Sequence, residues 1–198
     1  MSLFMESVNR SLHPAIRPAL PHEARLLGNL ALRSKAFWGY PVEFIESCRN
    51  ELTYSAKQIG SAESSFAVAE IAGMVVGFCA LENLSSSEVE LDALFVDPEW
   101  TGRGIGRQLL EHARRVAAER GASALVIQAD PHALPFYTAA GALVTGKRES
   151  ASIAGRYLPI LRLQTSEPDG AAGRLSERDS VVQDVSAAST REKQDLFE

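Results

Sequence analysis

The stretch LFVDPEWTGRGIGRQLLEHA, residues Leu94–Ala113, decides the fold of this 198-residue chain. It opens on apolar residues that are typical of a strand ending at Val96, and an Asp-Pro turn follows. From Ile105 onward apolar residues recur at helical spacing, with Leu109 and Ala113 on the same face. The sequence therefore predicts a strand, a glycine-rich turn and a helix in direct succession.

The turn between that strand and that helix, Thr101–Gly106, is a candidate anion site. Its glycines stand at alternating positions, Gly102, Gly104 and Gly106. Glycine permits positive φ angles and lets a ligand lie against the backbone, while a helix start offers unpaired N–H groups and a partial positive charge. This combination is typical of a phosphate site, although a glycine turn without a ligand is the alternative.

Two better-known phosphate motifs fit this turn poorly. A Walker loop needs Lys and Ser or Thr after its last glycine, whereas Arg107 and Gln108 follow here. A dinucleotide site is favoured only by Asp130, which ends the next predicted strand where a ribose-binding acid would stand. The glycine spacing is GxGxG rather than GxGxxG, and residues 97–101 separate the strand from the glycines. Dinucleotide binding remains the weaker alternative.

The other elements follow from hydrophobic periodicity and turn residues. In chain order we expect a strand at Pro14–Pro18, helices that begin near Pro21 and at Pro41 (the latter with apolar positions through Leu52), hairpin strands Ser65–Glu70 and Met74–Leu81, a strand Glu88–Val96, a helix ending at Gly121, a buried strand Ala124–Ala129, a short helix Pro131–Ala139, and strands Ala142–Thr145 and Tyr157–Leu163. This order predicts one α/β domain with a mixed, mostly antiparallel central sheet flanked by helices.

Charge divides the chain into two parts. The net charge is -5, which argues against a dedicated nucleic-acid binder. Residues 165–198 contain eight acidic and four basic side chains and no sustained apolar period, so we expect a domain at 1–164 and an acidic, disordered tail at 165–198. The domain itself is close to neutral, so its charge does not select an acceptor or a partner.

Several features indicate a soluble cytoplasmic protein without a metal. No apolar run is long enough to cross a bilayer, and the first residues lack the pattern of a secretory signal. Cys48 and Cys79 stand among apolar neighbours, as small buried hydrophobes do. No histidine shows ligand spacing, so we expect no metal site and assign His132 no role.

The strand–glycine loop–helix unit, together with the later segment DPHALPFYTAAGA at 130–142, resembles the GNAT superfamily of acetyl-CoA-dependent N-acetyltransferases. The order of elements is similar from about Ala15 to Leu163. The resemblance implies acetyl-CoA in an opening of the sheet between the strands ending at Val96 and Ala129, and no metal. The residues it implies for the cofactor are Leu94, Phe95, Val96, Thr101, Gly102, Arg103, Gly104, Ile105, Gly106 and Asp130. Two of these residues depart from the family pattern. Thr101 stands where the family usually has Gln or Arg, and Asp130 stands where many members have Asn.

The resemblance also implies direct transfer of the acetyl group to a primary amine within a ternary complex. Tyr137 matches the family's general acid, which protonates the departing sulfur, and its alternative role is core packing. Glu90 is our choice for the base, and Asp92 or a chain of waters is the alternative. Glu90 is equally explained as an exposed charge at the rim of its strand, without a catalytic role. A non-catalytic acyl-CoA sensor of the same fold is the alternative function.

The acceptor is the least determined part of the prediction. Trp38, Tyr40 and Arg156 fall in regions that form the acceptor pocket in the similar family, although the aromatics are as well explained by core packing. We expect a small-molecule or peptide amine, no nucleic acid and no membrane. A homodimer is compatible with the sequence, which does not select an oligomeric state.

Overall fold

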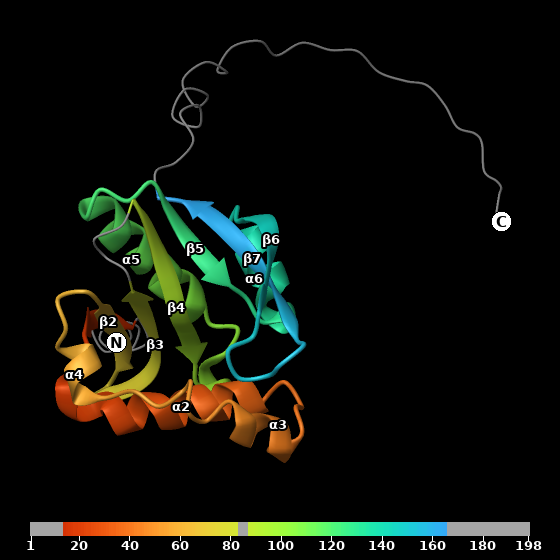
Figure 1. Cartoon of the computed structure of the whole chain (residues 1–198). Helices are drawn as coiled ribbons and strands as arrows, with labels where there is room; N and C mark the ends of the chain where they lie inside the picture. The colour runs from red at the N-terminus through yellow and green to blue at the C-terminus, as the bar shows by residue number, and fades with distance from the viewer. Residues whose placement is uncertain (1–13, 83–86, 166–198) are drawn as a thin grey trace, which may run out of the picture. The chain divides into compact units, whose positions relative to one another are not determined.

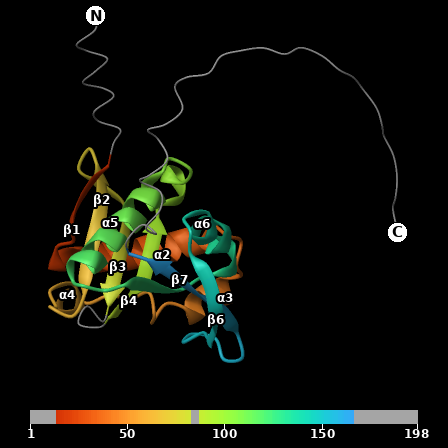
Figure 2. The ribbon, with the colours of Figure 1, turned by 90° about the horizontal axis from the view of Figure 1, so that it is seen from above.

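The structure is a computed structural model that describes residues 14–82 and 87–165 (Figure 1). The segment 166–198, which holds almost all of the predicted disordered tail, lies outside the described residues. The described chain forms one seven-stranded sheet in the order β1-β2-β3-β4-β5-β7-β6. Helices cover both of its faces, with α5 on one side and α2 on the other (Figure 2).

The strands are β1 (Ala15–Pro18), β2 (Ser65–Ile71), β3 (Met74–Glu82), β4 (Glu88–Val96), β5 (Ala124–Gln128), β6 (Leu143–Glu149) and β7 (Tyr157–Gln164). Every pair of neighbours is antiparallel except β4 and β5, which are parallel. The mixed, mostly antiparallel sheet predicted from the sequence is therefore confirmed. The β2–β3 turn has positive φ at both Ala72 and Gly73, which suits the twist of a two-residue hairpin.

The helices are α2 (Ala24–Ala36), α3 (Val42–Ser47), α4 (Ala56–Ile59), α5 (Ile105–Glu119) and α6 (Leu134–Ala139), with 3-10 turns η1 (Pro21–Glu23), η2 (Pro98–Trp100) and η3 (Pro131–Ala133). The prediction of helical periodicity through Leu52 was wrong, because α3 ends at Ser47. Leu52 packs instead as part of a turn against α2, where a Cβ on Gly28 would lie 2.8 Å from the Leu52 carbonyl oxygen. Its side chain is buried without a helix, so burial alone produced the apolar pattern.

The core consists of two apolar layers, one on each face of the sheet. Leu109 and Ala113 of α5 are fully buried in the first layer, while Leu27 and Leu30 of α2 are fully buried in the second. These are the faces that the helical periodicity predicted. The two cysteines are free and buried, and burial raises the pKa of each thiol, so both behave as small hydrophobes.

The sheet splits between its two parallel strands. β4 and β5 pair only from Glu88 with Ala124 to Glu90 with Val126. Beyond this point β4 continues to Val96, still paired with β3 on its other edge. The backbone of β4 that follows Glu90 therefore has no strand partner on its β5 side, which confirms the predicted opening. Within the described ranges, no helix has the length and apolar character needed to cross a bilayer.

Candidate active site

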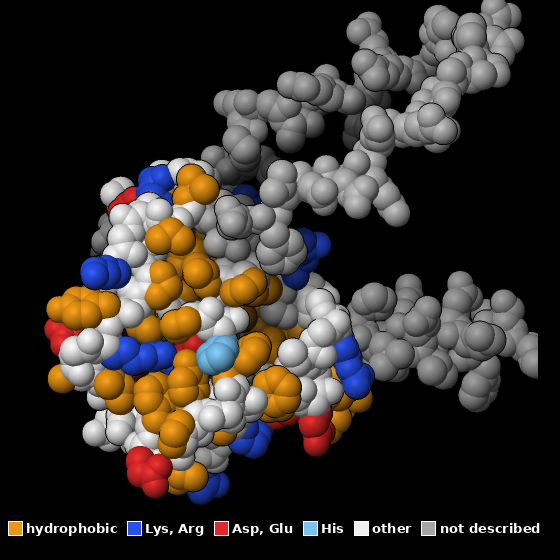
Figure 3. Space-filling model, turned by 90° about the vertical axis from the view of Figure 1, so that its right-hand side faces the viewer, with side chains coloured by type: hydrophobic (Ala, Val, Ile, Leu, Met, Phe, Trp, Pro, Cys, Tyr) orange, Lys and Arg blue, Asp and Glu red, His pale blue; other side chains and the backbone are white. Residues whose placement is uncertain are grey.

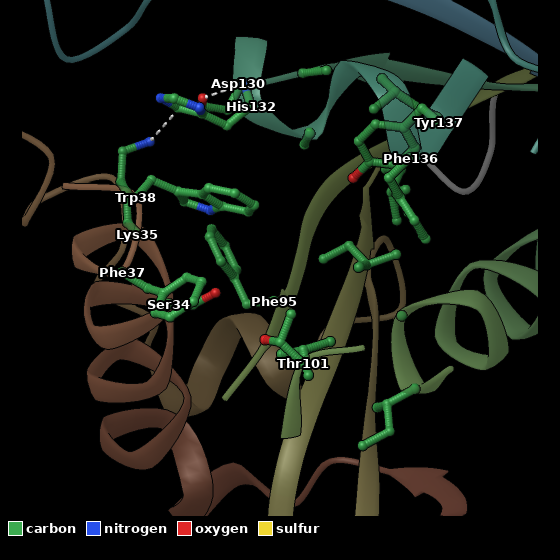
Figure 4. Close-up of a pocket in the computed structure, with 18 of the residues that line it drawn as sticks. Ser34, Lys35, Phe37, Trp38, Phe95, Thr101, Asp130, His132, Phe136 and Tyr137 are labelled. Carbon is green, nitrogen blue, oxygen red and sulfur yellow. Dashed lines mark hydrogen bonds and ion pairs between the residues drawn. The ribbon is translucent and has the colours of Figure 1, made fainter. Parts of the chain in front are cut away.

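A cavity of about 560 Å³ lies where β4 and β5 separate. Its walls come from α2, the end of β4, the start of α5, the end of β5 and α6. Figure 4 shows Phe37 and Trp38 on the α2 side, with Phe136 and Tyr137 reaching in from α6 opposite them. The connection between α3 and α4 and Leu158 of β7 also line it, so segments that are far apart in the sequence meet around one space.

The glycine loop forms the end of this cavity next to α5. Gly102 and Gly104 both have a φ of 79°, a left-handed conformation that favours glycine. Gly104 is the N-cap of α5, and the Gln108 N–H donates to its carbonyl at 3.2 Å. The N–H groups of Ile105, Gly106 and Arg107 come before that first helical bond and have no carbonyl within the helix to donate to. The predicted anion site therefore has the backbone geometry that such a site needs.

Nine of the ten residues predicted to hold the cofactor line the cavity: Leu94, Phe95, Val96, Thr101, Gly102, Gly104, Ile105, Gly106 and Asp130. Arg103 does not line it, and its guanidinium lies over the Trp100 ring at 4.7 Å from the centroid. Arg107 lines the cavity in its place. The assignment of these residues to cofactor binding stays a prediction.

Tyr137 contributes a hydroxyl to the cavity from α6. Its side chain is only 6% exposed, yet it lines the cavity and has no hydrogen-bond partner among the described residues. No buried side-chain polar atom in residues 14–82 and 87–165 lacks a partner, so this hydroxyl must be open to the cavity. Burial, and then the nearby Cys79, raise the pKa of Tyr137, which keeps the hydroxyl protonated as a donor.

The two carboxylates considered for the base differ in their surroundings. Glu90 is ion-paired with Arg148 at 2.8 Å and does not line the cavity. Asp92 lines the cavity and lies in a β-bulge. Its neighbours Ala93 and Leu91 pair with two consecutive residues of β3, so Asp92 between them has no partner in that strand. Loss of hydration, followed by the charges of nearby glutamates, raises the pKa of Asp92 to about 6 although its side chain opens on the cavity.

Asp130 is surrounded by donors from four segments of the chain. The Tyr40 hydroxyl lies 2.9 and 3.0 Å from its two oxygens, and the His132 N–H donates at 3.1 Å. Arg156 Nη2 approaches to 3.4 Å and Lys35 Nζ to 3.6 Å. Burial alone would raise the pKa of Asp130, but these hydrogen bonds and charges outweigh it and lower the pKa. Asp130 is thus an ionised carboxylate that is already well satisfied.

An aromatic wall stands beside Asp130. The Trp38 and His132 rings stack with centroids 5.2 Å apart and planes 7° apart, and the Tyr40 ring meets His132 edge-on. His132, to which the sequence assigned no role, lines the cavity. The available signal was its place two residues after Asp130 in an Asp-Pro turn, where the carboxylate accepts from the His132 backbone N–H.

The outer face of this region carries exposed apolar side chains. Figure 3 shows hydrophobic side chains gathered with scattered charges on the side of the molecule that bears β6, β7 and α6. Phe37, Trp38 and Val42 are 56%, 44% and 71% exposed beside the cavity wall. No group of three His, Cys, Asp or Glu side chains arranged to hold a metal ion occurs in the part of the chain that the structure describes.

Comparison with known proteins identifies the class. The model of the acetyltransferase (GNAT) family matches residues 31–142, which contain β2 to β5, the glycine loop and Tyr137. This chain belongs to that family, and the predicted resemblance is confirmed.

Two curated relatives are similar to part of this chain. The peptidyl-lysine N-acetyltransferase YjaB of Salmonella typhimurium is 40% identical over 73 residues, which are 37% of this chain and 48% of the relative. The Escherichia coli protein of the same name is 39% identical over 88 residues, or 44% and 54% of the two chains. The chain thus matches about half the length of these relatives.

Solved structures agree on the fold. The PaiA N-acetyltransferase of Thermoplasma acidophilum, determined in complex with coenzyme A, has a TM-score of 0.62 at 22% identity and covers 76% of this chain and 98% of its own. The ribosomal-protein-S18-alanine N-acetyltransferase of Escherichia coli has a TM-score of 0.58 at 18% identity, covering 80% and 97%. At these identities the likeness concerns the fold.

Proposed function

We propose that this protein is an N-acetyltransferase that transfers the acetyl group of acetyl-CoA to a primary amine by direct attack in a ternary complex. The observation that carries the proposal is the continuity of one cavity. It joins the free edge of β4, the glycine-capped start of α5, the open hydroxyl of Tyr137 and the carboxylate of Asp92.

The cavity suits two parts of acetyl-CoA, its pyrophosphate and its pantetheine arm. The left-handed glycines and the free N–H groups at the start of α5 would hold the pyrophosphate, and Arg107 would add a positive charge. The unpaired edge at Leu94–Val96 would bind the pantetheine arm as an added strand does. A backbone N–H of the same edge would stabilise the negative charge that develops on the thioester carbonyl oxygen.

Asp92 is the base that the geometry favours. It lines the cavity, and a base with a pKa of about 6 is both ionised at neutral pH and able to accept a proton. The ion pair with Arg148 engages Glu90, the base chosen from the sequence, so we assign Glu90 an electrostatic effect on Asp92. The incoming ammonium group loses a proton to Asp92, directly or through one water.

Tyr137 completes the transfer. As the amine nitrogen forms its bond to the carbonyl carbon, the carbon–sulfur bond breaks and the sulfur leaves as a thiolate. The Tyr137 hydroxyl, kept protonated by its burial, donates its proton to that sulfur. The acetylated nitrogen still carries one excess proton, which passes directly or through water to the Tyr137 phenolate and restores its hydroxyl. The products are an N-acetylated amine and the free thiol of CoA, and Asp92 later releases its proton to solvent.

A lysine side chain in a peptide is the first acceptor to test. The curated relatives are named as peptidyl-lysine N-acetyltransferases. The exposed apolar side chains of Phe37, Trp38 and Val42 would also give a peptide a surface beside the cavity.

The test is acceptor-dependent release of CoA thiol by the full chain, with mass spectrometry of the acetylated product. Lysine peptides, free amines and a reaction without acceptor are compared at one acetyl-CoA concentration. Acetyl-CoA binding without thiol release for any amine would favour the acyl-CoA sensor. Thermal stabilisation by NAD but not by CoA would contradict the proposal altogether.

A further inference from the structure

Three carboxylates beside the cavity have no cationic partner. Glu51, in the connection between α3 and α4, and Asp92 both line the cavity. Glu82, at the end of β3, is near enough for its charge to act on Asp92. Among the described residues, none of the three forms an ion pair.

Three basic side chains around the cavity already have acidic partners, while Arg107 lies at the other end, in the first turn of α5. Lys35 and Arg156 both face Asp130, at 3.6 and 3.4 Å, and Arg148 faces Glu90 at 2.8 Å. Two cations thus face the single carboxylate of Asp130, whereas no ion pair within the described residues engages Asp92. The cavity has an uncompensated negative charge on one side.

Tyr54 adds an unpartnered hydroxyl to the same side. Its side chain is 8% exposed, with its ring edge-on to those of Phe66 and Phe78 at 5.4 and 5.5 Å. It lines the cavity without a hydrogen-bond partner in the described ranges, where no buried side-chain polar atom is left unsatisfied, so its hydroxyl oxygen opens on the cavity. Burial and then the charges of Asp92 and Glu51 raise the pKa of Tyr54, which keeps this oxygen neutral and able to accept a hydrogen bond.

Glu51 is held in place by the connection between β6 and β7. The Ser152 hydroxyl, in the connection between β6 and β7, donates a hydrogen bond to the Glu51 carboxylate. Arg156 of the same connection contacts Asp130. One loop thus orients Glu51 without neutralising its charge, because a hydroxyl contributes no positive charge.

We propose that Glu51 and Tyr54, which line the cavity near the charges of Asp92 and Glu82, form a subsite for a second cationic group on the acceptor. The preferred acceptor is then an amine that carries another ammonium or guanidinium group, as in a free diamine or a lysine beside a second basic residue. This inference rests on the proposed function and deepens it. The Tyr54 oxygen and the carboxylates would accept hydrogen bonds from the second cation, while a carboxylate on the acceptor would be repelled.

The first measurement compares three acceptors with the same reacting amine: pentylamine, 1,5-diaminopentane and 6-aminohexanoate. We expect kcat/KM of the diamine to exceed that of the monoamine by about tenfold and the amino acid to be the poorest acceptor. The preference should weaken as salt is added, because partly exposed charges are screened. Lysine peptides flanked by arginine or by glutamate, assayed in parallel, distinguish a peptide source from a free diamine.

The second measurement uses variants and reports the ratio of diamine to monoamine kcat/KM. Tyr54→Phe keeps the ring and removes only the hydroxyl, and Glu51→Gln removes one charge. Each should lower the ratio about threefold. Glu43→Gln is the matched control, because Glu43 is exposed on α3 and does not line the cavity, and its ratio should not change.

The outcomes separate this inference from the proposed function. A monoamine acetylated as well as the diamine would overturn the subsite and leave the acetyltransferase standing. No thiol release with any acceptor would contradict the proposed function. In that event, calorimetry of 1,5-diaminopentane against the CoA-saturated protein decides the subsite, which fails if the diamine binds no more tightly than pentylamine.

Discussion

The Tyr40 hydroxyl contacts both carboxylate oxygens of Asp130, at 2.9 and 3.0 Å, across ninety positions of sequence. The contact joins the connection between α2 and α3 to the end of β5. With Arg156 and Lys35 on the same carboxylate, three segments in all are tied to the end of β5. Asp130 therefore holds this wall of the cavity together.

Replacing Asp130 should affect the acceptor more than the cofactor. In Asp130→Asn the amide places N–H donors against Tyr40 and Arg156, so the wall loosens. We expect KM for the amine to rise about fivefold to tenfold and KM for acetyl-CoA to change little. Tyr40→Phe is the companion variant and should act in the same direction. A rise in the acetyl-CoA KM alone would instead support the predicted contact of Asp130 with pantetheine.

Tyr137→Phe should lower kcat by about tenfold or more at saturating amine, because it removes the hydroxyl that we propose protonates the departing sulfur. The ring is retained, so packing in the core and the affinity for acetyl-CoA should survive. Steady-state kinetics and calorimetry with CoA measure the two effects. An unchanged kcat would remove Tyr137 from the mechanism.

The pH dependence should identify the base. A pKa of about 6 for Asp92 means that the ionised, proton-accepting form is lost as the pH falls through 6, so kcat/KM should decline on that side. Asp92→Asn should lower the rate by about a hundredfold and abolish this decline, the acidic limb of the pH–rate profile. Glu90→Gln removes a negative charge that helps to raise the pKa of Asp92, so the limb should shift to lower pH. The base would be Glu90 if its variant lost the limb and the Asp92 variant kept it.

Gly104→Ala should weaken CoA binding. A Cβ in this left-handed conformation costs about 1 kcal/mol, and relaxation of the loop would turn the N–H groups of α5 away from the phosphate. Gly121→Ala is the matched control, because Gly121 has a φ of 80° just after the other end of α5. Both variants should lose similar stability in thermal melts, but only Gly104→Ala should lose affinity for CoA.

The proposed boundary at 164 can be tested by two truncations. Removing 166–198 keeps Thr165, whose N–H and hydroxyl donate to the carbonyls of Ser123 and Ala122 at 3.1 and 2.7 Å. Removing 165–198 also removes those two bonds. Both truncated proteins should bind acetyl-CoA, with the shorter one slightly less stable in thermal melts. Lost binding in both would place part of the site beyond Thr165.

The sequence determined the features that depend on near neighbours. Alternating and helical apolar patterns predicted the strands and the two long helices, because burial of one face imposes a period of two or of about 3.6 residues. The glycine loop was equally local, since Gly102 and Gly104 adopt the positive φ that their spacing suggested. Tyr137 was found through a motif on one short helix.

Only the tertiary structure decided what surrounds each charge. Sequence order could not choose between Glu90 and Asp92, because a β-bulge and the distant Arg148 separate their environments. The near-neutral average of the domain likewise hid the unpaired carboxylates of Glu51 and Asp92 inside one cavity. Electrostatic energies depend on distance and burial in space, and residues from distant segments of the chain become neighbours only after the fold has formed.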